Sequence, residues 1–295
     1  MNQRSLKHFL ALAEHLHFGQ ASEACHISTS ALSRNIQQLE EELGVVLFNR
    51  DNRTVVLTSE GQQFLEYARD AIAQWKVIRN ELKDSTGPLQ GEISMYCSVT
   101  ASYSILFELL NEFRNNHPSI EIKLHTGDPD HAIARVVAGQ EDITIAAYPK
   151  TLPRGVVFKH ITNSPLVFIA PKAGSLIKAK SLNTLPPKSS EQWESTPMIL
   201  SEGGVARNRV DNWFKERQIT PRIYAQVAGN EAIVSMVSLG LGIGVVPQIV
   251  IDHSPMAERI KILKVKPELE PYNIGLLTLI KHLKNPMIKA FWDLL

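Results

Sequence analysis

The sequence predicts a multidomain chain in which a small, mainly helical domain is followed by one long helix and then by a larger α/β domain. Three observations lead to this prediction. Short amphipathic helices and two strand-like runs fill the first 58 residues, and an uninterrupted helical pattern continues from residue 59 to about residue 85. From residue 91 onward, strand-like and helix-like stretches alternate, which is typical of an α/β domain. At 295 residues the chain is long enough to bury more than one core.

The first three helices follow from apolar spacing and from end signals. Residues 5–16 carry apolar side chains at helical spacing, and a second short helix is expected over residues 20–25. Ser28 is a candidate N-cap for a third helix. That helix is expected to run to Leu43 and to stop at Gly44, because glycine readily ends a helix.

Residues 45–48 and 54–57 alternate as short strands around Asp51-Asn52-Arg53, which predicts a two-stranded wing. The whole succession is a winged helix-turn-helix, a fold that presents one helix to the major groove of DNA. The polar face of the third helix could instead be ordinary solvated surface, but the succession of helices, turn and wing favours DNA binding. The candidate DNA-binding residues are Ser28, Thr29, Ser30, Ser33, Arg34, Gln37, Arg50, Asn52 and Arg53.

The DNA-binding prediction cannot rest on overall charge. The chain carries a formal net charge of +1, and residues 1–60 hold five Lys or Arg against seven Asp or Glu. Contacts with phosphates and bases would therefore depend on where Arg34, Arg50 and Arg53 point.

The long helix begins near Ser59 and contains no proline and only Gly61 up to about residue 85. Its apolar stripe needs a partner, and a second copy of the chain would supply one. The alternative is that the helix packs on its own domain. Gly87 to Gly91 then break the helix, so we expect domains at 1–58, 59–90 and 91–295. The stripe consists of Leu65, Ala68, Ile72, Trp75, Ile78 and Leu82.

The C-terminal region predicts a largely parallel sheet with helices between its strands. Gly240, Gly242 and Gly244 could be taken for a nucleotide-binding loop, but they precede a strand, so a tight turn between a helix and a strand is favoured. The expected elements, strands and helices together, are 93–98, 102–117, 120–125, 132–138, 143–147, 167–171, 198–200, 207–216, 223–227, 232–239, 244–246, 274–279 and 286–294.

Several polar residues follow expected strands, where an open α/β sheet binds its ligand. Ser98 and Thr100 stand at the start of a helix, a place suited to a carboxylate, although plain helix capping is the alternative. For Thr126 and the loop at Gly203, a turn without ligand contact is equally well supported. The candidate effector-binding residues are Ser98, Val99, Thr100, Ser102, Thr126, Gly127, Asp128, Glu202, Gly203 and Glu231.

Other classes of protein find less support. The chain shows no nucleophile-elbow motif, and His15, His17, Cys25 and His26 do not have a zinc-binding spacing, so we expect no catalytic site, metal or cofactor. A secreted solute-binding protein would need a signal peptide, and the N-terminus lacks an apolar core with a cleavage site. Two distant cysteines and the absence of a membrane-length apolar run favour the cytoplasm.

The first 61 residues resemble the LysR-type transcriptional regulators. The resemblance implies a winged helix-turn-helix, a dimerising linker helix and an effector domain of two subdomains similar to periplasmic binding proteins. It places subdomain I at about 91–162 and 266–295, and subdomain II at about 163–265. It also implies operator DNA, a second copy of the chain (a dimer or tetramer) and RNA polymerase as partners. The matching motifs are Phe18-Gly19-x-Ala21-Ser22-x-Ala24, Ala31-Leu32-Ser33-Arg34-x-Ile36, Leu39-Glu40-x-Glu42-Leu43-Gly44, Leu47-Phe48-x-Arg50 and Leu57-Thr58-x-x-Gly61.

Weaker matches extend the resemblance through Gly240-x-Gly242-Ile243-Gly244-x-x-Pro247, while Thr29-Ser30 replaces the Gln-Pro of many members and leaves the operator sequence open. Within the family, the segments at 50–55, 97–101 and 231–237 are similar to those of activators of branched-chain amino acid biosynthesis. This similarity implies 2-acetolactate or 2-aceto-2-hydroxybutyrate as effector, the ketol-acid reductoisomerase gene as target, and repression of the chain's own gene. A regulator of another pathway with a different small anionic effector is the alternative.

Overall fold

The computed structural model describes residues 2–50, 54–83, 88–172 and 186–295. The chain divides into two compact units, Met1–Gly87 and Pro88–Leu295. Each unit has its own hydrophobic core, and each is described by itself below. None of the described helices is long and apolar enough to span a membrane.

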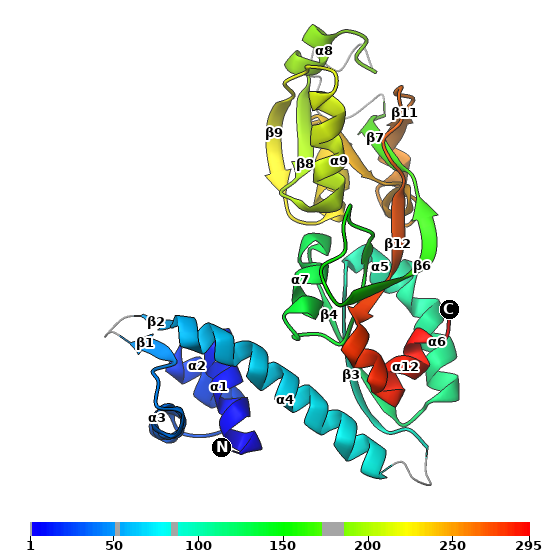
Figure 1. Cartoon of the computed structure of the whole chain (residues 1–295). Coiled ribbons are helices and arrows are strands. Elements are labelled where there is room, and N and C mark those ends of the chain that lie inside the picture. The colour runs from blue at the N-terminus through cyan, green and yellow to red at the C-terminus, as the bar shows by residue number, and fades with distance from the viewer. Residues whose placement is uncertain (1, 51–53, 84–87, 173–185) are drawn as a thin grey trace. The chain divides into compact units, whose positions relative to one another are not determined.

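The first unit is a winged helix-turn-helix followed by one long helix (Figure 1). The strands of the wing pair antiparallel, with Phe48 opposite Leu57. Phe9, Leu32 and Ile36 are fully buried in its core, and Leu65 from the long helix joins them. The elements are α1 (Gln3–His15), α2 (Phe18–Ala24), α3 (Thr29–Leu43), β1 (Phe48–Arg50), β2 (Val55–Leu57) and α4 (Ser59–Lys83).

The ends of α3 follow the expected signals. The side chain of Ser28 accepts a hydrogen bond from the Ala31 N–H, and Gly44 adopts the left-handed conformation with a φ of 72°. Helix α2 begins at Phe18, earlier than expected, because the ring nitrogen Nδ1 of His17 accepts a hydrogen bond from the Gln20 N–H at 3.3 Å. Histidine is an uncommon N-cap, so the residue pattern contains no signal for this start.

The second unit contains two five-stranded sheets. Sheet I has the order β4-β3-β5-β12-β6, and sheet II has the order β11-β7-β10-β8-β9 (Figure 1). The strands of sheet I are β3 (Gly91–Cys97), β4 (Ile120–Thr126), β5 (Ile143–Ala147), β6 (Val156–Ser164) and β12 (Tyr272–Leu279). Those of sheet II are β7 (Leu166–Pro171), β8 (Pro197–Ser201), β9 (Arg222–Val227), β10 (Ile243–Pro247) and β11 (Ile260–Leu263).

Helices cover both sheets and connect their parallel strands. A cluster of aromatic rings, Phe168, Trp193, Trp213 and Phe214, fills the core against sheet II, with ring centroids 5.0–6.4 Å apart. The helices are α5 (Val99–Ser104), α6 (Leu106–Asn116), α7 (Ala132–Val137), α8 (Ser190–Ser195), α9 (Gly204–Lys215), α10 (Asn230–Ser238), α11 (Gln248–Asp252) and α12 (Pro286–Trp292), with 3₁₀ turns η1 (Pro129–His131), η3 (Ala257–Arg259) and η4 (Ile280–Lys284).

The expectation of largely parallel sheets is wrong. Strand β12 pairs antiparallel with β5 and β6, and β7 pairs antiparallel with β10 and β11. The chain leaves sheet I between Ser164 and Leu166 and returns from sheet II between Leu263 and Tyr272. A strand that enters a sheet directly from the other sheet needs no crossover helix, so it can run antiparallel to its neighbour.

The single helix expected over 102–117 is divided into α5 and α6 at Ile105. The hydroxyls of Ser102 and Ser104 donate to the carbonyl oxygens of Val99 and Thr100 at 2.7 Å. Such local bonds compete with the regular helical ladder. Strands β6 and β11 have no counterpart among the expected elements. Their buried residues do not alternate regularly with exposed ones, so they carry little period-two signal.

Candidate DNA-binding surface and effector cavity

The polar face of α3 is held outward by the apolar face behind it. Leu32, Ile36 and Leu39 are buried in the core of the first unit. The expected DNA-binding side chains on the opposite face are exposed, apart from Ser33, which is half-buried. This face consists of Ser28, Thr29, Ser30, Ser33, Arg34 and Gln37.

The contacts on this face are short-range. The hydroxyls of Thr29 and Ser22 lie 3.1 Å apart and join α3 to α2. The Nε of Arg34 donates to the Ser30 carbonyl oxygen at 3.4 Å, and the Gln37 amide donates to Glu41 at 3.2 Å. The bonds of Arg34 and Gln37 run along α3 and leave these two side chains on exposed surface, where they can contact a nucleic acid.

Arg50 has a different environment from the residues of α3. Its guanidinium pairs with the carboxylate of Glu40 and lies over the Phe18 ring, 5.5 Å from the centroid. Glu40 also accepts hydrogen bonds from the backbone N–H groups of Leu47 and Phe48, at 2.8 and 3.2 Å. Glu40 therefore ties the first wing strand to the end of α3. No role was expected for it, although its place in the family motif was a signal.

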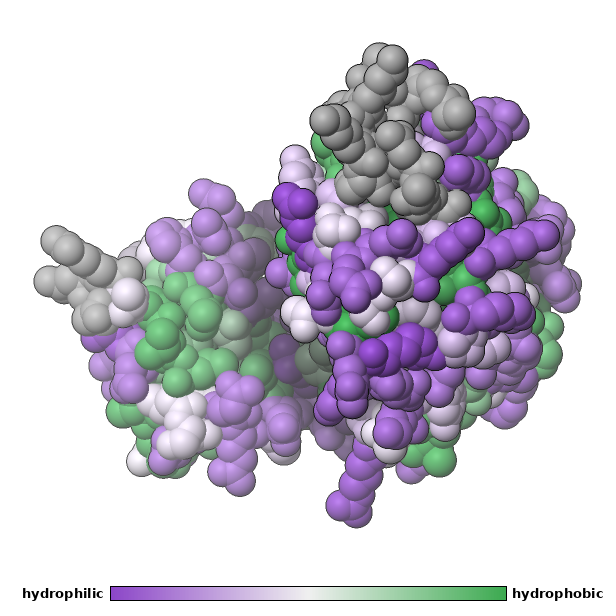
Figure 2. Space-filling model, turned by 90° about the horizontal axis from the view of Figure 1, so that it is seen from above, coloured by the Kyte–Doolittle hydropathy of each residue, from purple (hydrophilic) through white to green (hydrophobic). Residues whose placement is uncertain are grey.

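Two other expected DNA contacts, Asn52 and Arg53, lie outside the described residues. The long helix α4 is described, and it leaves large side chains in solvent. Tyr67, Trp75 and Ile78 are each 50% exposed. Figure 2 shows hydrophobic areas on the surface of the first unit among hydrophilic ones.

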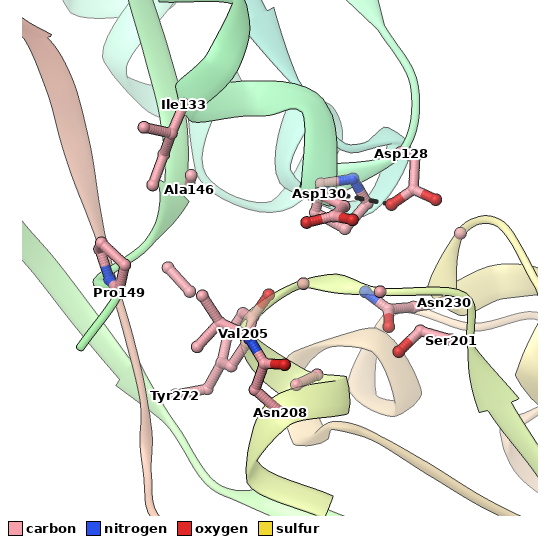
Figure 3. A pocket seen from close by; sticks show the side chains of 16 residues that line it. Asp128, Asp130, Ile133, Ala146, Pro149, Ser201, Val205, Asn208, Asn230 and Tyr272 are labelled. Carbon is pink, nitrogen blue, oxygen red and sulfur yellow. Dashed lines mark hydrogen bonds between the residues drawn. The ribbon is translucent and has the colours of Figure 1, made fainter. Parts of the chain in front are cut away.

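In the second unit a cavity of about 250 Å³ is lined from both sheets. Asp128 and Asp130 lie on one side, and Ser201, Asn208 and Asn230 lie across from them (Figure 3). Of the expected effector residues, Asp128 and Gly203 line this cavity. Asp130, Asn208, Asn230 and Tyr272 were missed because they stand at no recognisable motif, although Asp130 and Asn230 lie beside the expected Asp128 and Glu231.

A smaller adjoining cavity of about 30 Å³ is lined by Ser98 and Thr100. The two cavities share Asn230 and Tyr272 among their lining residues. Glu231 fills the position where an effector carboxylate was expected: its Oε1 accepts hydrogen bonds from the Thr100 N–H at 2.9 Å and from the Thr100 hydroxyl at 2.5 Å. Thr100 and Glu231 were both expected to contact the effector, but in this structure they bind each other.

The remaining expected effector residues do not line either cavity. The Ser98 side chain also caps α5 at the Ala101 N–H, and Ser102 donates to a backbone carbonyl within the same turn. Gly127 packs against Tyr96, whose hydroxyl donates to the Asp128 carbonyl oxygen at 2.8 Å and so fixes the loop. The residues that do not line the cavities are Val99, Ser102, Thr126, Gly127, Glu202 and Glu231.

Tyr272 lies at the point where the two cavities meet, at the start of β12. Burial raises its pKa to about 12; the nearby Arg209 charge opposes this shift, and the carboxylates of Asp128 and Asp130 add to it. The phenol is therefore neutral at ordinary pH. Among the described residues, no three His, Cys, Asp or Glu side chains form a group that could hold a metal ion.

Comparisons with known proteins agree with this architecture. Residues 3–62 match the bacterial regulatory helix-turn-helix protein family lysR, and residues 86–295 match the LysR substrate binding domain. The chain is 43% identical over 299 residues to the HTH-type transcriptional activator IlvY of Salmonella typhimurium, covering 100% of this chain and 99% of that protein. It is 42% identical over 296 residues to the activator IlvY of Haemophilus influenzae, covering 100% of both chains.

Solved structures show the same fold at lower identity. A full-length variant of OxyR from Pseudomonas aeruginosa has a TM-score of 0.68 at 22% identity, covering 99% of this chain and 94% of that one. Full-length CbnR in complex with its target DNA has a TM-score of 0.60 at 24% identity, covering 99% of this chain and 98% of that one. The chain therefore belongs to the LysR family of DNA-binding transcriptional regulators and is not an enzyme.

Proposed function

We propose that the chain activates expression of ketol-acid reductoisomerase in isoleucine and valine biosynthesis, in response to 2-acetolactate or 2-aceto-2-hydroxybutyrate, and represses its own gene. The observation that carries this proposal is the identity of 42–43% with IlvY activators over the whole chain, both domains included. OxyR and CbnR, by contrast, share the fold at only 22–24% identity.

The cavity in the second unit supports a small polar effector. Its volume of about 250 Å³ suits a metabolite rather than a large cofactor. The chain crosses between the two sheets that line it at residue 165 and at residues 264–271, so a ligand that contacts both sheets can change their relative position. We expect the bound effector to shift the DNA-binding domains of the oligomer through this change.

A second copy of the chain is the partner that α4 favours. Tyr67, Trp75 and Ile78 are half exposed on one long helix, and pairing of two such helices would bury them. A twofold dimer, or a tetramer built from two dimers, would match a palindromic operator. RNA polymerase in the cytoplasm is the partner through which an activator would act.

DNA recognition is tested first with Arg34→Ala. Loss of one guanidinium contact to a base or phosphate should weaken binding to the DNA upstream of the reductoisomerase gene about tenfold to hundredfold, by gel shift at fixed salt. Arg154→Ala removes the same charge from an exposed position in the other unit and should leave operator affinity unchanged. Equal operator affinity of Arg34→Ala and the unaltered chain would remove Arg34 from the DNA contact.

The effector is tested by calorimetry with the full chain. We expect 2-acetolactate or 2-aceto-2-hydroxybutyrate to bind, while pyruvate and the branched-chain amino acids bind much more weakly. Sequence-selective DNA binding without any response to the two acetohydroxy acids would favour the alternative, a LysR-type regulator with a different small anionic effector.

A further inference from the structure

The lining of the 250 Å³ cavity is unusual for an anion-binding site. None of the described residues that line it is a lysine or an arginine, and two of them, Asp128 and Asp130, are acidic. We infer that Asp130 accepts a hydrogen bond from a hydroxyl group of the ligand, so that the cavity selects hydroxy acids with one carboxylate over the same acids without the hydroxyl. This inference rests on the proposed function and names the group that recognises the effector.

Asp130 has more free accepting capacity than Asp128. The Oδ1 of Asp128 already accepts a hydrogen bond from the Asp130 N–H at 3.0 Å, which closes the turn before α7 (Figure 3). The carboxylate of Asp130 is exposed to the cavity, and no described residue donates to it. An ionised carboxylate only accepts hydrogen bonds, so the complementary ligand group must be a donor.

The opposite wall supplies donors for the ligand's oxygen atoms. Asn230 is 7% exposed as a residue, and its amide lines the cavity and has no hydrogen-bond partner among the described residues. Its amide atoms are open to the cavity, since Asn230 is not among the described side chains with a buried polar atom that lacks a partner, so its NH₂ group is free to donate to an acceptor of the ligand. The 12-residue helix α9 also begins at this wall, and its N-cap Gly203 provides no side-chain cap for the first N–H groups.

The two walls are close enough for one small molecule to contact both. A Cβ atom built on Gly203 would lie 2.4 Å from the Oδ2 of Asp130, and one on Gly204 would lie 3.0 Å from its Oδ1. The two glycines therefore leave the space in which Asp130 approaches the start of α9. A ligand hydroxyl on Asp130 and a ligand carboxylate near Asn230 fit this arrangement.

The charge of the lining limits the number of carboxylates that the ligand can carry. Asp128 and Asp130 repel a second carboxylate, and no described lining residue carries a positive charge that would offset the repulsion. A ligand with a single carboxylate, a keto oxygen and a hydroxyl donor satisfies both walls.

The test compares two probes that differ only in the hydroxyl group: 2-acetolactate and 2-methylacetoacetate. Calorimetry on the unaltered full chain should show about tenfold tighter binding of 2-acetolactate, the contribution expected of one hydrogen bond to a charged group. In Asp130→Ala the ratio of the two dissociation constants should fall below about twofold. Because each probe carries one carboxylate, removal of the Asp130 charge changes both affinities alike and cancels in the ratio.

Asp252→Ala is the matched control, since Asp252 is exposed and does not line the cavity, and its ratio should equal that of the unaltered chain. Equal binding of the two probes by the unaltered chain, or an unchanged ratio in Asp130→Ala, would overturn the inference while leaving the effector assignment in place. Binding of neither probe by the unaltered chain, with operator binding intact, would overturn the inference and the proposed effector together.

Discussion

The DNA-binding unit and the effector unit differ in how their functional residues are brought together. In the first unit, the candidate DNA-contacting residues of α3 fall within ten consecutive positions, from Ser28 to Gln37. In the second unit, one cavity takes side chains from Asp128, Ser201, Asn230 and Tyr272, which are separated by up to 144 residues. A local pattern determines the first site, and tertiary structure determines the second.

This difference extends to the contacts that hold each site. Glu40 supports the wing from the helix that directly precedes it, within ten residues of all its partners. Glu231 instead reaches Thr100 across 131 residues and joins α10 beside sheet II to α5 beside sheet I. Substitutions in the first site should therefore act within one unit, whereas those in the second should act on how two sheets are held together.

The largest expected effect is that of Glu40→Ala. It leaves the partly buried N–H groups of Leu47 and Phe48 without an acceptor and removes the partner of Arg50. We expect the free energy of unfolding of the first unit to fall by about 3 kcal/mol, because each lost acceptor for such a group costs roughly 1–3 kcal/mol. Hydrogen exchange on the full chain measures this loss, since it follows the two units separately.

Glu40→Gln keeps one acceptor oxygen and serves as the control, with a loss of about 1 kcal/mol expected. In Glu40→Ala, exchange should accelerate in residues 3–50 and stay unchanged in the second unit. Equal acceleration of hydrogen exchange in both units would mean that the DNA-binding site depends on more than the local contacts of Glu40.

The same contrast explains how far the sequence predicts the structure. Apolar spacing, the Ser28 cap and Gly44 predict α3 at both ends, because each signal acts within one helical turn. The effector domain's two-subdomain fold came from family resemblance, and its strands β6 and β11 were missed because their pairing partners, not their own alternation, define them.

The candidate cavity shows the same limit at the level of single residues. Asp128 and Gly203 were predicted, since each follows a strand where such ligands bind. Thr100 and Glu231 were also singled out, but no sequence pattern indicates that the carboxylate would bind the threonine. Asp130 and Asn230 become candidate ligand contacts only in the folded structure, which places them on opposite walls of one cavity (Figure 3).

A smaller effect is expected for the contact between Thr100 and Glu231. A double-mutant cycle with Thr100→Val and Glu231→Ala isolates the bond from the hydroxyl to the carboxylate. We expect a coupling energy of about 1.5 kcal/mol in the unfolding of the second unit, the lower end for a hydrogen bond to a charged group. Glu231→Gln, which keeps an acceptor oxygen, should retain part of this coupling energy. Additive effects of the two substitutions would show that the bond does not hold the sheets together.

The smallest expected effect concerns Cys97, which is buried at the end of β3, three residues before Thr100. Burial raises the pKa of its thiol from 9.0 to about 12, so the folded chain keeps a proton that the unfolded chain releases. The stabilisation from this proton is fully present below pH 9.0 and is lost as the pH rises toward 12. Between pH 9 and pH 10 the free energy of unfolding of the second unit should fall by about 1 kcal/mol from this group.

Urea unfolding at pH 8, 9 and 10, followed by the fluorescence of the buried Trp193 and Trp213, measures this slope. In Cys97→Ala the fall in the free energy of unfolding between pH 9 and pH 10 should be smaller by about 1 kcal/mol, because alanine has no proton to release. The pKa of Tyr272 is raised to about 12 from an ordinary value of 10.0, which is higher than that of a thiol, so Tyr272→Phe should change the slope mainly above pH 10 and less than Cys97→Ala between pH 9 and pH 10. If the pH dependence of the free energy of unfolding is the same in Cys97→Ala, the thiol is not the group that makes this unit sensitive to alkali. The end of β3 beside Thr100 would then admit more water than its packing indicates.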